Sequence, residues 1–174
     1  MDNRLLVSEF IEALQERADE RYKGKLPQAF VDWYIEAEFG NVDWKFTDDS
    51  GDGGIDAVIR LPGERPPVAI VQSKFTARVG RALLSAKAYA EFDEVIEAFR
   101  GDSFDEYLGS TREDARPIYR RIHGQLTDIG DWRVEQKAFR LISTANRRRQ
   151  LEHHLIPSSG YLYADQIIDR KSVV

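Results

Sequence analysis

The chain has 174 residues, of which 42% are hydrophobic and 32% charged, with a formal net charge of -5 and no cysteine. This composition describes a globular domain that buries its own core, and it excludes a disordered tail and a fibre. The lack of cysteine excludes disulfides, thiolate zinc sites, iron–sulfur clusters and cysteine nucleophiles, and no apolar run approaches the ~20 residues that a membrane span needs.

Hydrophobic periodicity and turn residues predict the elements in chain order. Two helices come first, followed by a strand, a loop rich in glycine and aspartate, and two strands joined by a turn rich in proline and glycine. Two helices, a strand, a helix, a short strand and a last helical turn complete the chain. The expected ranges are, in order, 4–20, 26–39, 42–46, 55–61, 68–75, 82–100, 112–127, 139–144, 147–155, 161–163 and 165–170.

This order predicts an α/β fold with a mixed central sheet, in which a hairpin meander is followed by a crossover strand, flanked by helices. The chain shows no internal repeat, low-complexity tract or linker. We therefore expect a single domain over residues 1–174, with its core over about 26–155. The first ten residues lack the apolar centre of a signal peptide, so we expect a cytoplasmic protein.

The predicted hairpin brings three polar side chains to one end of two apolar strands. A turn centred on Glu64 places Asp56 opposite Gln72, and Lys74 points to the same face because it follows Gln72 by two residues. Ionisable groups among apolar neighbours cost several kcal/mol unless they are paired, bound to a metal or functional. The three residues form the main candidate site; the alternative is a turn aspartate, a hydrogen-bonded core amide and a strand-end lysine.

Acidic side chains near the hairpin supply the remaining candidates. On the helix over 26–39, a step of 100° per residue places Glu38 on the apolar side and Glu36 on the opposite side. We therefore expect Glu38 to join the site, with Glu36 as second choice because a helix can roll. Asp52, in the loop before the hairpin, is a further second choice.

The pattern of these residues resembles a nuclease motif. A helix that bears an acid comes first, followed by residues 53–56 (Gly-Gly-Ile-Asp) and then by a strand that ends in residues 72–74 (Gln-Ser-Lys). This pattern resembles the PD-(D/E)XK nuclease superfamily. The local sequence is most similar to the Mrr-like branch and, within it, to the N-terminal nuclease domain of AIPR abortive-infection phage-resistance proteins. The likeness in element order covers about residues 26–145, and motif identity is confined to residues 51–75.

The resemblance implies a restriction endonuclease-like core, a metal-dependent nuclease activity and a role in anti-phage defence. It also implies that the chain is the N-terminal part of a longer protein. Asp56, Gln72 and Glu38 would hold Mg²⁺ or Mn²⁺, which prefer oxygen ligands. Lys74 would orient or deprotonate the attacking water and stabilise the transition state. Gln72 stands where many members have glutamate, which leaves one-metal and two-metal chemistry open.

Basic residues indicate the partner. Arg147, Arg148 and Arg149 follow a predicted strand, and Arg78 and Arg81 follow the candidate lysine. A phosphate contact and a solvated basic face explain such a pattern about equally well. The resemblance favours nucleic acid, with DNA expected rather than RNA and no membrane partner, and the sequence leaves a homodimer open. The alternative function is an inactive nuclease-fold domain that binds nucleic acid or another protein.

Overall fold

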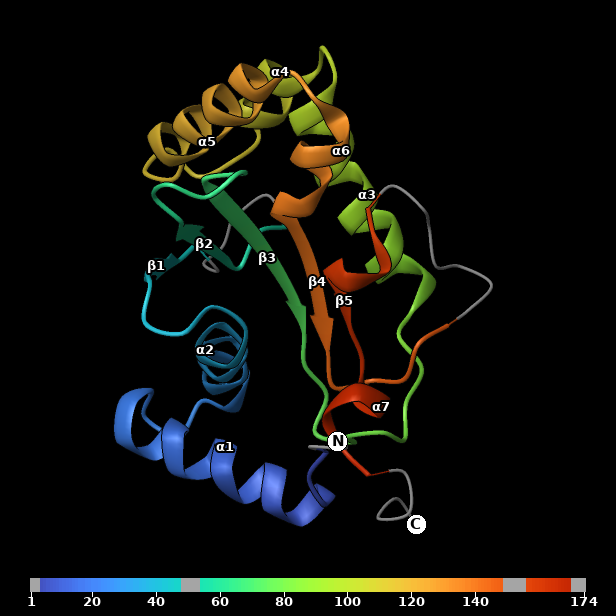
Figure 1. Ribbon diagram of the computed structural model, residues 1–174. Helices are drawn as coiled ribbons and strands as arrows, with labels where there is room; N and C mark the ends of the chain where they lie inside the picture. The colour runs from blue at the N-terminus through green and yellow to red at the C-terminus, as the bar shows by residue number, and fades with distance from the viewer. Residues whose placement is uncertain (1–3, 48–53, 149–155, 170–174) are drawn as a thin grey trace.

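The structure is a computed structural model that describes residues 4–47, 54–148 and 156–169 (Figure 1). The helices are α1 (Val7–Arg21), α2 (Leu26–Phe39), α3 (Ala86–Arg100), α4 (Phe104–Gly109), α5 (Arg116–Ile129), α6 (Trp132–Glu135) and α7 (Ala164–Ile167). The strands are β1 (Asp43–Phe46), β2 (Ala57–Arg60), β3 (Val68–Lys74), β4 (Phe139–Ser143) and β5 (Tyr161–Leu162). Two 3-10 helices, η1 (Gln136–Ala138) and η3 (Ser158–Gly160), precede β4 and β5.

The strands form one mixed sheet in the order β1-β2-β3-β4-β5. The first three pair antiparallel, and β4 joins β3 and β5 in parallel. Val58 lies opposite Ile70, and Ala57 lies opposite Val71, so the predicted hairpin register is confirmed. The chain crosses from β3 to the parallel strand β4 through α3 to α6 (Figure 1), and the expected α/β fold with a mixed sheet flanked by helices is confirmed.

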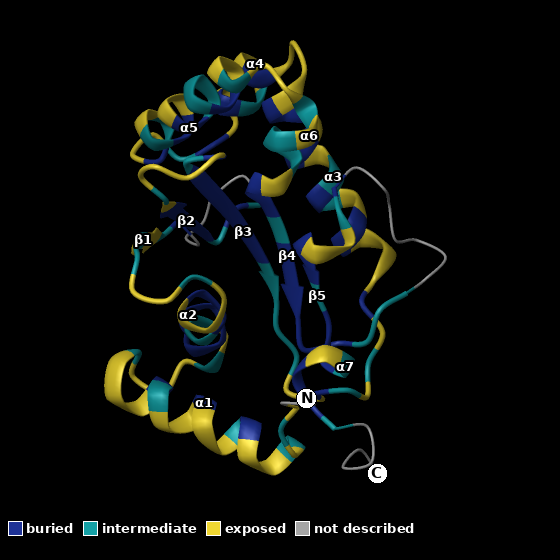
Figure 2. Ribbon diagram, viewed as in Figure 1, coloured by how far each residue is buried: buried dark blue, intermediate teal, exposed yellow. Residues whose placement is uncertain are grey.

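Each face of the sheet buries its own core because neighbouring residues of a strand point to opposite faces. On one face, α1 and α2 pack against side chains that include Ile59 and Val71. On the other face, α3, α4 and α5 pack against side chains that include Val58 and Ile70. Figure 2 shows β3 and β4 largely buried between the helices, whereas much of α1 is exposed.

Some element bounds differ from the predictions for local reasons. Helix α3 begins at Ala86 because the Ser85 side chain caps it, accepting a hydrogen bond from the Ala88 N–H (3.1 Å). The sequence does not predict α4 and α6, which are too short to show a helical period. Arg147 and Arg148 are not helical, and the rest of the helix expected over 147–155 lies outside the described residues. None of the helices in the described ranges is long and apolar enough to cross a membrane.

Candidate functional site

Asp56, Gln72 and Lys74 lie together where β2 begins and β3 ends. Asp56 directly precedes β2, and its N–H donates to the Val71 carbonyl (2.9 Å). Its carboxylate Oδ2 accepts a hydrogen bond from the Ser73 N–H (2.6 Å), which fixes the acid beside the end of β3. Gln72 and Lys74 are two residues apart on that strand and share one face of it. The structure therefore brings the three sequence-predicted residues to one place.

A cleft of about 350 Å³ opens at this place, between the strand ends and α3. Since a water molecule occupies about 30 Å³, the cleft has room for roughly ten waters, or for a hydrated cation and a phosphate group. Its walls come from the loop before β2, the end of β3, α3 and α4. The lining residues are Gly54, Asp56, Gln72, Ser73, Lys74, Glu91, Glu94 and Tyr107.

Gln72 is the most deeply buried polar residue that lines the cleft. The residue is only 2% exposed, and its Oε1 has no hydrogen-bond partner among the described residues. A buried amide oxygen without a partner costs about 1–3 kcal/mol. Gly54 borders the same side chain in a left-handed conformation (φ 84°), and a Cβ there would lie 3.7 Å from Gln72 Nε2 and 3.2 Å from Val95 Cγ2. The site thus keeps an acceptor oxygen unused.

Helix α3 contributes two acids that the sequence analysis did not single out. Glu91 Oε2 lies 2.6 Å from Lys74 Nζ, and both side chains are 34% exposed. Lys87, one turn earlier, is 3.8 Å from the other oxygen of Glu91. Glu94 lines the cleft one turn further along α3. Their spacing of three residues beside an apolar helical stripe was the available signal, but sequence does not reveal which face of the sheet the helix covers.

The expectation that Glu38 or Glu36 completes this site is wrong. Helix α2 covers the opposite face of the sheet, where Glu38 Oε1 pairs with Arg140 Nη1 (3.2 Å). Glu36 Oε2 instead pairs with Arg17 Nη1 of α1 (2.6 Å). The Glu38 side chain is 50% exposed rather than core-facing, and it contacts Arg140 of β4 from the side of the sheet away from Asp56.

The expected phosphate-binding arginines differ in their surroundings. Arg147 lies over the Tyr163 ring, with its Cζ 5.0 Å from the ring centroid. Arg148 Nε donates to the Leu84 carbonyl (2.9 Å), so this side chain connects the segment after β4 to the loop before α3. Arg78 and Arg81 are exposed in the loop after β3. Two further candidates, Asp52 and Arg149, lie outside the described residues.

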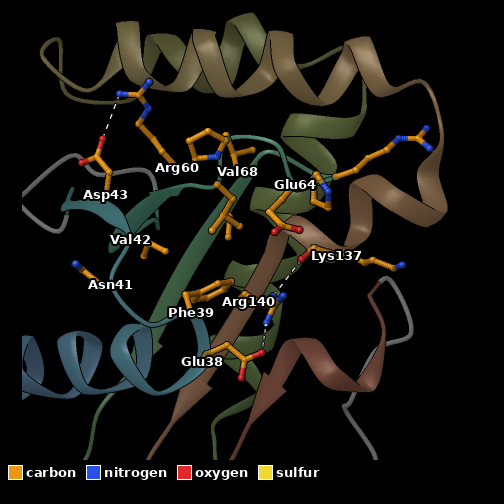
Figure 3. Close-up of a pocket in the computed structure, with 15 residues that line it drawn as sticks. Glu38, Phe39, Asn41, Val42, Asp43, Arg60, Glu64, Val68, Lys137 and Arg140 are labelled. Carbon is orange, nitrogen blue, oxygen red and sulfur yellow. Dashed lines mark hydrogen bonds and ion pairs between the residues drawn. The ribbon is translucent and has the colours of Figure 1, made fainter.

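A second, larger pocket of about 650 Å³ lies where β3 begins, beside the end of α2 (Figure 3). Arg140 is its central charge: it lies 5.1 Å from the Phe39 ring and pairs with Glu38. Arg140 Nη1 also donates to the Tyr34 hydroxyl (3.3 Å). Burial raises the pKa of Tyr34, and the arginine opposes this change. Because Arg60 likewise pairs with Asp43 (3.2 Å), the pocket's two β-strand arginines are already neutralised.

A charged cluster lies between α1 and α2, remote from the cleft. Asp32 is 7% exposed and pairs with Arg17 (2.7 Å) and Arg21 (3.3 Å). The Tyr22 hydroxyl also donates to the Asp32 carboxylate, and burial together with this hydrogen bond raises the pKa of Tyr22. All of these groups are satisfied by one another, so we assign the cluster to stability.

The cleft is lined by side-chain oxygens of two kinds. Within the described ranges, no group of three or more His, Cys, Asp and Glu side chains is arranged to hold a metal ion. The cleft instead combines the Asp56 carboxylate with the amide carbonyl of Gln72. Comparisons with protein-family models, curated proteins and solved structures find no match to this chain.

Proposed function

We propose that the protein is a divalent-metal-dependent nuclease that hydrolyses phosphodiester bonds of nucleic acid at the cleft between β3 and α3. The main support is the buried, unpartnered Oε1 of Gln72, which lies with Asp56 and Lys74 in one cleft. An acid, an unused carbonyl and an ammonium at one strand end are the groups that binding of a cation and a phosphate requires.

The oxygen donors fit Mg²⁺ or Mn²⁺. Mg²⁺ keeps several of its waters and commonly takes only one or two carboxylates from the protein, the rest coming from substrate phosphates. Asp56 supplies one charged oxygen, and Gln72 supplies a neutral oxygen that has no other partner. When bound, such a cation lowers the pKa of a water and offsets charge on the phosphate. Asp56 and Gln72 are the residues we propose as its ligands.

Lys74 is the residue we propose to act on the phosphate. Its ammonium is held in the cleft at 2.6 Å from Glu91, so its position is fixed before a substrate arrives. A fixed cation stabilises the negative charge that develops on a phosphate oxygen during hydrolysis. Glu91 acts through Lys74 and is a positioning residue in this proposal.

The setting of the activity follows from the sequence resemblance. The motif at residues 53–74 supports a restriction endonuclease-like core and a role in anti-phage defence. The motif residues do not discriminate DNA from RNA, and we take DNA as the first substrate to test, in a cytoplasmic protein. We propose these together with the nuclease activity, and a homodimer as one arrangement to test.

One observation favours the alternative of an inactive domain that binds nucleic acid or protein. Lys74 already has a close acidic partner in Glu91, and a lysine whose charge is satisfied internally can have a purely structural role. Loss of the ion pair would then lower stability slightly and change no activity. The two functions therefore differ in what substitution of Lys74 does.

Cleavage assays separate the two functions. Supercoiled plasmid, linear single-stranded DNA and RNA are each incubated with Mg²⁺, Mn²⁺ or EDTA. We expect metal-dependent cleavage that Asp56→Asn and Lys74→Ala each reduce by at least a hundredfold, equivalent to about 2.7 kcal/mol of transition-state stabilisation. Asp43→Asn and Lys45→Ala, on the exposed edge strand β1, are the matched controls and should cleave normally. Absence of cleavage on all three substrates, or equal cleavage by Lys74→Ala and wild type, contradicts the proposal.

A further inference from the structure

The loop of residues 76–85, which leaves β3, is fastened to the segment that leaves β4. The Thr76 N–H donates to Thr144 Oγ1 (2.7 Å), and this hydroxyl donates to the Thr76 carbonyl (2.8 Å). Asn146 Nδ2 donates to the Gly80 carbonyl (2.7 Å), and its N–H donates to the Ala82 carbonyl (2.7 Å). Hydrogen bonds therefore hold the 76–85 loop along most of its length.

Two buried side chains anchor the 76–85 loop as well. Val79 is 3% exposed and belongs to the core under α1 and α2. Leu84 is 4% exposed and belongs to the core under α3, and its N–H donates to the Asn146 carbonyl (2.8 Å). Because the loop is anchored in each core, it loses little conformational entropy when a ligand binds to it, and its binding surface is already ordered.

The anchored loop presents two free cations and one free apolar side chain. Arg78 and Arg81 are exposed, and neither side chain has an ion pair or hydrogen bond with the described residues. The Arg81 N–H donates to the Arg78 carbonyl (3.0 Å), so one turn carries both. Leu83 is 56% exposed, more than any other large hydrophobic residue in the described ranges. The surface therefore suits an anion that is joined to an apolar group.

We propose that the 76–85 loop docks single-stranded nucleic acid beside the cleft, with Arg78 and Arg81 on phosphates and Leu83 against a base. This inference rests on the proposed function, because it assumes that the phosphate to be hydrolysed lies next to Lys74. Arg78 follows Lys74 by four residues, so their Cα atoms are at most about 14 Å apart. One strand can thus touch the loop and enter the cleft.

The exposed leucine favours a single strand over a duplex. Covering a leucine side chain gains on the order of tenfold in affinity. In a duplex the base faces are stacked, and unstacking one base step lowers the affinity on the order of a hundredfold. This loss is larger than the gain from covering the leucine. In a single strand the base faces are available without that cost.

Fluorescence anisotropy in EDTA tests the docking without any cleavage. The probes are labelled 20-nucleotide single-stranded DNA, RNA of the same sequence, and the DNA duplex. We expect tighter binding of a single strand than of the duplex, and a five- to tenfold loss for Leu83→Ala on the single strand with an unchanged salt dependence. Arg78→Ala/Arg81→Ala should weaken binding of all probes. The slope of log affinity against log salt should fall by about 1.4 on the single strands, from about 0.7 per phosphate contact, and by about 1.8 on the duplex, from about 0.9 per contact.

Matched control variants distinguish failure of the docking inference from failure of the proposed nuclease function. Leu6→Ala and Arg133→Ala remove an exposed leucine and an exposed arginine elsewhere, and both should bind as wild type does. Equal affinity for single strand and duplex, or loop variants that match these controls, overturns the docking inference. If binding follows the loop but no metal supports cleavage, the docking inference stands and the proposed nuclease function fails.

Discussion

Replacement of Gln72 by glutamate tests directly whether its buried oxygen faces a cation. Gln72 is 2% exposed and lines the same cleft as Asp56, while the Lys74 ammonium in that cleft is already engaged by Glu91. Without metal, Gln72→Glu therefore adds a buried carboxylate that has no cation to pair with. Protonation of the new carboxyl at pH 7 limits the penalty to about 4 kcal/mol, and we expect a loss of about 2 to 3 kcal/mol in the free energy of unfolding. For a chain of this size the melting temperature should fall by about 4 to 12 °C.

A cation should reverse this loss, because the added charge strengthens its binding. A ligand at a hundred times its Kd stabilises the folded state by about 2.7 kcal/mol, which is close to the expected penalty. The assay is thermal unfolding of wild type and Gln72→Glu in EDTA and in increasing Mg²⁺ or Mn²⁺. Gln136→Glu, a glutamine in η1, is the control for the charge change alone. If Mg²⁺ and Mn²⁺ raise the melting temperature of Gln72→Glu no more than that of wild type, the cleft does not bind a cation through Gln72.

Three further outcomes are expected elsewhere in the fold. If Glu91 acts through Lys74 as proposed, Glu91→Gln should lower kcat by about tenfold with little change in KM, and the free energy of unfolding should change by less than about 1 kcal/mol for this half-buried pair. A matching effect of Glu94→Gln in steady-state kinetics would contradict the positioning role. Asp32→Ala should destabilise the fold by about 3 kcal/mol in denaturant titrations, because it removes the buried carboxylate that Arg17, Arg21 and the Tyr22 hydroxyl share. A loss under 1 kcal/mol would refute this. Burial raises the pKa of Tyr34 above its ordinary 10.0, so the unfolded chain loses this proton first, and the free energy of unfolding should fall as pH rises above about 10. For Tyr34→Phe, the free energy of unfolding measured from pH 8 to 11 should fall less steeply than for wild type.

The hairpin could be predicted because its determinants are local. The residues of the turn and the two-residue alternation of apolar side chains specify the register from Ala57 to Arg60, and the same alternation places Gln72 and Lys74 on one face. Asp56 lies one residue beyond the ladder, yet its hydrogen bond to Ser73 keeps it at the expected place. Local pattern was sufficient for these three residues.

The acids could not be assigned because their positions depend on long-range packing. The helical angle of Glu38 places it on the apolar side of α2, but its side chain is 50% exposed, and the angle does not indicate which face of the sheet α2 covers. From sequence alone, Glu91 is expected to be a solvent-exposed acid on a long helix. Only the crossing of α3 over the end of β3 brings it to Lys74. Residues such as Ser85, which caps α3, show how a single side chain moves a boundary that periodicity places several residues earlier.

The core is divided into two parts, one on each side of the sheet, so the side chains of the two faces have few partners in common. The Asp32 cluster belongs to the layer of α1 and α2, while Glu91 and the cleft belong to the layer of α3, with the strands between them. Substitutions without shared partners usually add in their effects to within about 0.5 kcal/mol. The layer of α1 and α2 can therefore be stabilised, labelled or redesigned as a scaffold, with little expected change in the residues of the cleft on the other side of the strands.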